Sequence, residues 1–308
     1  MMTTKTRYWM VGLGVIFALL IGEVSLRVVE ARIPMSTTWP SPETHVKSAQ
    51  LANLGQDVEI LFLGSSITEA AVDPALLMTL TGSGLAYNSA LPFSSPLSNE
   101  LWLAEVALAN VSPSTVIIGV PAWPTHSTSE DDTLQNGIQQ SLAGIATPTA
   151  TSSLALVRSK GVLADWEQRS VGVRLTESGL WTDLGHMTGY YEASGGTLAG
   201  RFPPYGVPAM SSDNRAALTR TVSALTEAGI GVVVMIEPGS YPGQSSDSEV
   251  ESYLGSIRDF GEELGIPVWD TYSVGWDSSY HADEAHFNRE GTIAFTTYLA
   301  GLVSELDR

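Results

Sequence analysis

The stretch EILFLGSSITEA, residues 59–70, joins an apolar run to a glycine and two serines. The apolar residues predict a buried strand over 58–64, and the polar residues after it predict a turn into a helix. Such a turn exposes a hydroxyl and presents backbone N–H groups at a helix N-terminus, where an oxyanion can be stabilised. Ser65 and Ser66 are therefore candidate nucleophiles, and a helix cap is the simpler interpretation of the same serines taken alone.

Strands and helices alternate along the rest of the chain. Further apolar runs predict strands at residues 85–90, 115–120, 231–238 and 266–272. Apolar residues at helical spacing predict helices at residues 97–111, 213–228, 248–264 and after Asn288. The alternation favours an α/β fold with a doubly wound, parallel, five-stranded sheet. Sheets of this kind bind ligands outside the carboxyl ends of their strands, where Gly64 lies.

The chain divides into three expected parts, the first of which, residues 1–30, is described in the next paragraph. Residues 31–57 are rich in Pro, Ser and Thr and predict a linker, and residues 58–308 form the expected α/β domain. Within that domain the pattern loosens at residues 121–210, which predict an insertion over one edge of the sheet.

The N-terminus has the pattern of a membrane-targeting segment. Lys5 and Arg7 precede an uncharged stretch, Tyr8–Gly22. Residues 1–30 therefore predict a cytoplasmic tail and a single transmembrane anchor, with the C-terminal domain periplasmic or extracellular. A cleavable signal peptide is the alternative, with a weak small-residue site at residues 29–31.

Charge and cysteine content exclude several classes of partner and chemistry. The formal net charge is −18, and the lysines are Lys5, Lys47 and Lys160. No basic stripe can form for a phosphate backbone, so nucleic acid is not an expected partner. The chain has no cysteine, which excludes disulfides and thiolate chemistry.

The stretch HADEAHFNREG near the C-terminus contains a second candidate group. Asp283 and His286 are spaced so that the carboxylate can fix the tautomer of the ring while the other ring nitrogen faces a serine. The simpler interpretation is a solvated acidic loop in which Asn288 caps the last helix. His281, Glu284 and the same two residues could also bind a metal ion, but we expect no metal and no other cofactor.

Together, GSSIT and DEAHFNREG resemble the GDSL/SGNH hydrolase family, whose first block reads G-D-S-x-[ST] and whose last reads D-x-x-H-x-[NS]. The resemblance covers about residues 58–305 and implies a flavodoxin-like sheet of SGNH type. It implies that Ser66 is the nucleophile, because Ser65 stands where the family has Asp. It also implies that His286 is the base and Asp283 the acid that orients it.

The two middle blocks of the family depart from its pattern here. The second block, an Asn followed by a Gly, keeps Asn88 but lacks the glycine. The backbone N–H of Ala90 or Ser94 is then the candidate oxyanion donor, together with that of Ser66 itself. The third block keeps Gly119 but has Pro121 where the family has Asn. The polar and aromatic candidates downstream are Trp123, His126 and Asn136.

Three functions are compatible with these patterns. The first is a membrane-tethered, extracytoplasmic serine esterase or acyltransferase acting on O-acyl groups of glycans or lipids, as the resemblance implies. The second is a catalytically inactive accessory or scaffold subunit of a larger membrane complex, which the missing oxyanion residues favour. It would dock through the aromatic insertion that contains Trp181, Tyr190 and Tyr191. A solute-binding module is a third possibility, with only the fold class in its favour.

Overall fold

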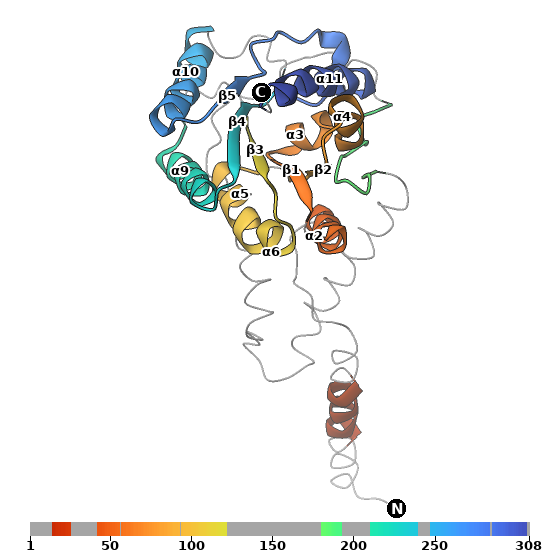
Figure 1. The fold of residues 1–308 in the computed structure, drawn as a ribbon. Helices are drawn as coiled ribbons and strands as arrows, with labels where there is room; N and C mark the ends of the chain where they lie inside the picture. Colours follow the sequence, from red (N-terminus) through yellow and green to blue (C-terminus); the bar gives the residue numbers. More distant parts are fainter. Residues whose placement is uncertain are drawn as a thin grey trace, which may run out of the picture.

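The computed structural model describes residues 14–25, 42–55, 57–92, 94–121, 180–192, 210–239, 247–283 and 285–306. Within these residues the chain forms a parallel five-stranded sheet of order β2-β1-β3-β4-β5 (Figure 1). The strands are β1 Val58–Leu63, β2 Leu85–Asn88, β3 Thr115–Val120, β4 Gly231–Ile236 and β5 Val268–Asp270. The chain order reverses between β1 and β3, so the turn after β1 lies at a topological switch point. The predicted sheet is thus confirmed in strand number, direction and approximate position.

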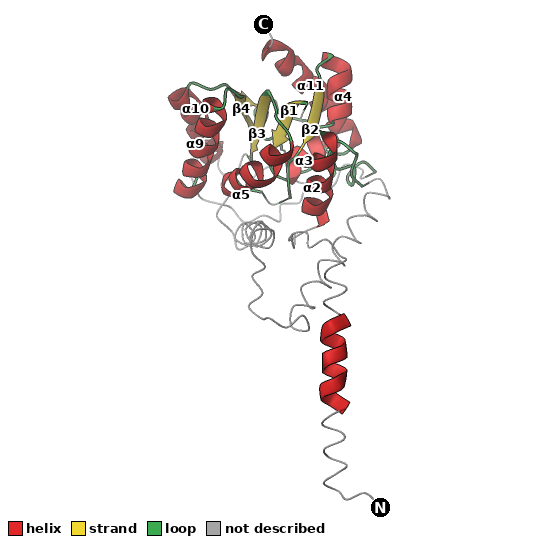
Figure 2. Cartoon of the chain, turned by 60° about the horizontal axis from the view of Figure 1, so that its bottom comes forward, coloured by secondary structure: helices red, strands yellow, loops and turns green. Residues whose placement is uncertain are grey.

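Helices cover both faces of the sheet, which is the doubly wound arrangement (Figures 1 and 2). One face packs against α2 Pro42–Leu54, α5 Pro96–Trp102, the π-helical turn Leu103–Ala107, α9 Ser212–Glu227 and α10 Asp247–Leu264. The other face packs against α3 Ser66–Ala71, α4 Pro74–Thr81 and α11 Arg289–Leu306. A short helix, α6 Leu108–Asn110, follows the π-helical turn.

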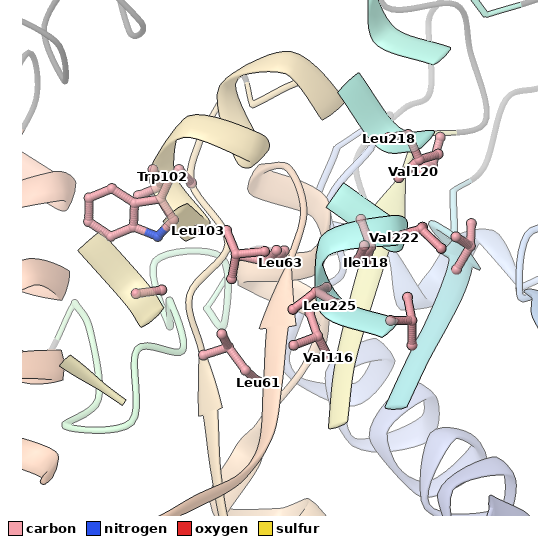
Figure 3. Close-up of a cluster of buried hydrophobic side chains, with 14 of the residues drawn as sticks. Leu61, Leu63, Trp102, Leu103, Val116, Ile118, Val120, Leu218, Val222 and Leu225 are labelled. Atoms are coloured by element: carbon pink, nitrogen blue, oxygen red, sulfur yellow. The ribbon is translucent and has the colours of Figure 1, made fainter. Parts of the chain in front are cut away.

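Alternation along β1 divides the core into two layers. Leu61 and Leu63 point to the layer with α5 and α9, where they pack with Trp102 and Leu225 (Figure 3). Ile60 and Phe62 belong to the opposite layer, with side chains of α4 and α11. Because β1 is buried on both faces, its sequence is a continuous apolar run rather than an alternating one.

Two helices were not predicted from the sequence. Helix α2 lies within the segment expected to be a linker, and its Lys47 and Leu51 are fully buried. The composition of residues 31–57 does not reveal this, because the helix is held by contacts with the distant turn after β2. Helix α4 begins at a proline capped by Asp73, whose Oδ1 accepts from the N–H groups of Ala75 and Leu76.

The helix starts agree with the sequence to within a residue or two. Asn288 caps α11 as expected, because its Oδ1 accepts from the N–H of Gly291 at 3.0 Å. Helix α10 begins at Asp247, beside the predicted start at residue 248. The helix predicted over residues 97–111 contains a π-helical turn at Leu103–Ala107.

The N-terminal segment is described only in part. Residues 14–25 are helical, and the remainder of the expected anchor lies outside the described residues. Over the ranges that the structure describes, no helix has both the length and the apolar character needed to cross a membrane. The anchor therefore stays a prediction.

Candidate active site

Three predicted residues from opposite ends of the domain meet at the carboxyl edge of the sheet. Ser66 is the first residue of α3, directly after the turn that follows β1. Its Oγ lies 2.9 Å from His286 Nε2, and His286 Nδ1 lies 2.9 Å from Asp283 Oδ2. A carboxylate only accepts, so Nδ1 carries the proton and Nε2 accepts from the Ser66 hydroxyl. This is the arrangement of a serine nucleophile, a general base and an orienting acid.

The loop before α11 holds the acid and the base in fixed relation. Asp283 Oδ1 accepts from the backbone N–H groups of Ala285 and His286, at 2.9 and 2.8 Å. Burial raises the pKa of Asp283, but the hydrogen bonds and charge of His286 and these two N–H groups outweigh it and lower the pKa to about 2. The carboxylate is therefore ionised throughout the neutral pH range. His286 has a side chain 15% exposed, so its ring remains accessible from outside.

A buried carboxylate that sequence reasoning missed supports the nucleophile turn. Glu237 follows β4 and is fully buried. Its Oε1 accepts from Ser65 N–H at 2.7 Å and from Thr68 Oγ1 at 2.6 Å, and its Oε2 accepts from Ser65 Oγ at 2.7 Å. Burial raises the pKa of Glu237, and these hydrogen bonds oppose the shift. Ser65 is thus a structural residue, which leaves Ser66 as the candidate nucleophile.

Two glycines make room for this carboxylate. A Cβ at Gly64 or at Gly119 would collide with Thr68 Oγ1 and would lie within 2.7 Å of Glu237 Oε1. Gly64 also has φ +152°, a conformation that residues with a side chain rarely adopt. The retained Gly119 is therefore explained by packing. A single acid at the end of a predicted central strand was the sequence signal that could have identified Glu237.

The turn after β2 does not supply the predicted oxyanion donors. Asn88 is fully buried, and its Nδ2 donates to the carbonyls of Thr68 and Val72, at 2.9 and 3.0 Å. The N–H of Ala90 donates to Asn88 Oδ1 at 3.2 Å, and that of Ser94 donates to the Leu91 carbonyl at 3.2 Å. The prediction that these residues bind an oxyanion is therefore wrong for the geometry observed, because their polar groups hold the turn and α3 together.

One predicted donor keeps a suitable position. Ser66 is at the first helical position of α3, where a backbone N–H has no acceptor within its own helix. Pro121 follows β3 directly and contributes neither an N–H nor a side-chain amide. The other candidates, Trp123, His126 and Asn136, lie outside the described residues.

Part of the expected insertion reaches the site. The segment 180–192 is held against the end of α3, because Met187 N–H donates to the Glu69 carbonyl at 3.1 Å. It places the ring of Tyr190 on that of His286, with centroids 4.3 Å apart and planes 5° from parallel. Sequence reasoning placed Tyr190 in the insertion but assigned it no place in the site. No local pattern links it to His286, since the two residues are far apart in the sequence.

A buried ion pair joins α2 to α3 and also receives a hydrogen bond from the segment 180–192. Lys47 Nζ lies 3.0 Å from Glu69 Oε1, and both side chains are fully buried. Trp181 Nε1 donates to the same Glu69 oxygen at 3.0 Å, and Lys47 also donates to the carbonyls of Asn88 and Ala90. A buried pair of this kind is strongly destabilising when one partner is removed, because the other charge is left uncompensated.

The residues considered for a metal site have other partners. Asp283 and His286 bind each other, and the buried His281 places Nδ1 3.2 Å from the carbonyl of Asp277. Glu284 lies outside the described residues. Among the side chains that the structure describes, no group of three or more His, Asp or Glu residues could hold a metal ion.

Comparison with known proteins gives weak but consistent similarities. No protein-family model and no curated protein matches the sequence. Solved structures do match, at low identity. A lipase/acylhydrolase from Enterococcus faecalis is 12% identical with a TM-score of 0.43, covering 81% of this chain and 96% of that one. A GDSL-like lipase from Bacteroides thetaiotaomicron is 13% identical with a TM-score of 0.46, covering 87% and 99%.

A third match is a catalytic mutant of an acetylxylan esterase from Geobacillus stearothermophilus, 13% identical with a TM-score of 0.42, covering 82% and 95%. The site itself rests on the geometry of Ser66, His286 and Asp283 in this chain.

Proposed function

We propose that this chain is a serine esterase or acyltransferase of GDSL/SGNH type. The observation that carries the proposal is the continuous hydrogen-bonded line from Ser66 Oγ through both nitrogens of His286 to Asp283. A structural serine at a helix start needs no such partner, since its hydroxyl can cap the helix by itself, as Ser65 does here.

In the first step, Ser66 Oγ attacks the carbonyl carbon of an ester while its proton moves to His286 Nε2. The ionised Asp283 stabilises the imidazolium that forms. The tetrahedral intermediate collapses when the bond to the leaving alkoxide breaks, and His286 returns the proton to that oxygen. The products of this step are a free alcohol and an acyl group on Ser66.

In the second step, His286 takes a proton from water or from an acceptor hydroxyl, whose oxygen attacks the acyl carbon. The bond to Ser66 breaks, and the proton returns to Oγ. Water as the acceptor gives a carboxylic acid, and a hydroxyl gives a new ester. The triad supports both outcomes equally.

The oxyanion is the weak part of the site. Ser66 N–H is available at the start of α3, whereas Asn88 and Ala90 are engaged elsewhere and Pro121 has no N–H. Loss of one oxyanion donor lowers kcat by about 10²–10³ in serine hydrolases. We therefore propose a slow enzyme with simple activated esters.

We further propose that the enzyme is membrane-tethered and extracytoplasmic and that its substrates are O-acyl groups of glycans or lipids. Support comes from the basic flank before Tyr8–Gly22 and from the family resemblance. Protease protection tests the orientation. We expect a protease that reaches the outer face of the cytoplasmic membrane, but does not enter the cytoplasm, to cleave the C-terminal domain. A domain that is protected until the cytoplasm is opened contradicts it.

The test of the catalytic proposal is labelling of the full-length chain with a fluorophosphonate probe, beside hydrolysis of 4-nitrophenyl acetate. We expect labelling of the wild type at Ser66 and none of Ser66→Ala. Ser65→Ala is the matched control, since Ser65 faces Glu237, and its labelling should persist at a reduced rate. Absence of both labelling and ester turnover in the folded wild type refutes the proposal.

A catalytically inactive accessory subunit is the second candidate. The observation in its favour is the turn after β2, where the N–H groups of Ser89, Ala90 and Leu91 all have acceptors within the protein. Purification in a mild detergent tests it: co-purifying subunits together with an unreactive Ser66 favour the accessory role. A reactive Ser66 in a chain that purifies alone excludes it.

A further inference from the structure

Tyr190 covers one face of the His286 ring. The two rings are almost parallel, at 5°, and their centroids are 4.3 Å apart. The edge of the same imidazole is engaged by Ser66 on one side and by Asp283 on the other. The ring of Tyr190 therefore restricts the rotation that would move Nε2 out of line with Ser66.

The segment that carries Tyr190 is anchored rather than free. Asn88 N–H donates to the Leu184 carbonyl at 2.9 Å, and Trp181 Nε1 donates to Glu69 at 3.0 Å. Gly185, with φ +79°, lets the segment approach the backbone of Asn88 so closely that a Cβ there would collide with its carbonyl oxygen. Tyr190 is thus held over His286 by contacts with α3 and the end of β2.

An aromatic face carries negative charge density and attracts a cation above it. In the proposed reaction the His286 ring gains positive charge as it takes the proton from Ser66, so the attraction grows as the reaction proceeds. An interaction that strengthens in this way lowers the barrier, whereas one of constant strength does not.

We propose that Tyr190 is a positioning residue of the Ser66 site, which holds the His286 ring in line with Ser66 and stabilises its protonated form. The inference rests on the proposed function and deepens it. It assigns a mechanistic role to the described part of the insertion, residues 180–192.

The groups around the imidazole are Ser66 from α3, Asp283 from its own loop and Tyr190 from the segment 180–192. Glu69 of α3 is a further charge near Tyr190. Burial, followed by the charges of Asp283 and Glu69, raises the pKa of Tyr190. The phenol is therefore neutral across the working range of pH, and it is the ring face that acts on His286.

The experiment measures the rate of fluorophosphonate labelling against pH in the full-length chain, for wild type, Tyr190→Phe and Tyr190→Leu. Phenylalanine keeps the ring face, and leucine keeps bulk over His286 without it. We expect Tyr190→Phe to match the wild type. Tyr190→Leu should shift the acid side of the curve of labelling rate against pH, its acid limb, down by about 0.5 pH unit. It should also lower the rate on the plateau of that curve by about threefold.

Tyr191→Leu is the matched control, because this neighbouring ring contacts His186 and Arg289 instead. Its acid limb should coincide with that of the wild type. The proposal is overturned if Tyr190→Leu leaves the acid limb within 0.1 pH unit of the wild type, or if Tyr191→Leu shifts it equally.

A second readout separates failure of this inference from failure of the proposed function. The ring carbons of 13C-labelled histidine are followed by NMR through the same titration, with the His286 signal assigned by its loss in His286→Gln. We expect the same downward shift of the titration midpoint in Tyr190→Leu. This readout needs no reactive serine, so an unlabelled Ser66 would refute the enzyme while the midpoint still decides the role of Tyr190.

Discussion

Two histidines, His186 and His286, lie at opposite ends of helix α3, and each contacts one of two neighbouring tyrosines. His286 faces Ser66 at the start of the helix and stacks on Tyr190. His186 lies at the other end, where its Nε2 is 3.1 Å from the carbonyl of Ala70 and its Nδ1 is 3.3 Å from the hydroxyl of Tyr191. A carbonyl only accepts, so His186 donates through Nε2 and accepts through Nδ1 as a neutral ring.

The difference between them shows what makes His286 a candidate general base and His186 a structural residue. His186 is fully buried, and this burial lowers its pKa to about 4. The charge of Asp73 raises the pKa of His186, but burial outweighs it. The two ring nitrogens have the Ala70 carbonyl and the Tyr191 hydroxyl as partners. His286 has an ionised carboxylate behind it, a hydroxyl in front of it and a partly exposed ring. The four predictions that follow test this contrast.

The largest expected effect is the loss of ester turnover when His286, the histidine at the start of α3, or its partner Ser66 is removed. His286→Ala and Ser66→Ala should each lower kcat/KM for an activated ester by about 10³-fold or more, and the double variant should be no worse than either. Steady-state kinetics on the full-length chain measure this. Additive losses in the double variant would show that the two residues do not act as one unit.

The next largest effect tests the carboxylate that is hydrogen-bonded to the ring of His286. Asp283→Asn should lower kcat by about 10²–10⁴, because the amide no longer stabilises the imidazolium and favours the wrong tautomer. Since the pKa of Asp283 is about 2, its carboxylate stays ionised between pH 5 and 8, so the loss should be measured on the pH-independent plateau of both rates. A plateau rate equal to that of the wild type would show that Asp283 neither orients nor stabilises His286.

The third effect is a pH dependence of stability that comes from His186. The unfolded ring binds a proton below its ordinary pKa of about 6.5, whereas the folded ring does so only below about 4. Stability from this group is therefore complete above pH ~6.5 and falls by up to about 3 kcal/mol as pH drops toward 4. Urea unfolding of the full-length chain at several pH values measures it.

His186→Gln is the matched variant for this measurement, because its amide can still donate to Ala70 but does not titrate. It should be less stable than the wild type at pH 7 and should lose less stability on acidification. An equally steep loss in both proteins would show that other groups cause the pH dependence.

The smallest effect concerns Asn88, which shares the C-terminal end of α3 with His186. Asn88→Ala should cost about 1–3 kcal/mol of unfolding free energy, because the carbonyls of Thr68 and Val72 at the end of α3 each lose a buried donor. Asn110→Ala, which removes one amide-to-carbonyl bond at a half-buried helix end, is the control and should cost less. A large loss of kcat with unchanged stability would instead restore Asn88 to the oxyanion site.

The residues of the proposed triad, which the structure brings together, are those with a local signal. Ser66 follows an apolar strand and a glycine, and Asp283 and His286 share one short loop before a helix capped by Asn288. The backbone of each turn fixes their direction. The doubly wound parallel sheet could then be expected from the alternation of strands and helices.

The residues that were missed or wrongly assigned have partners far away in the sequence. Glu237 contacts Ser65, which is 172 positions away in the sequence, and Lys47 contacts Asn88, which is 41 positions away. Asn88 has the type and place of an oxyanion residue, yet the packing of α3 beside it uses its amide. Composition also made residues 31–57 look like a linker, although α2 is buried by contacts that composition does not encode.

The sequence by itself determined the fold class, the approximate position of the strands and the candidates for nucleophile, base and acid, because strand periodicity and turn chemistry act over a few residues. Only the tertiary structure decided which polar groups remain available for chemistry. A residue whose hydrogen-bond donor is used inside the protein and one whose donor faces a substrate look the same in the sequence. What separates Asn88 from Ser66, and His186 from His286, is which distant group arrives within about 3 Å of them when the chain folds.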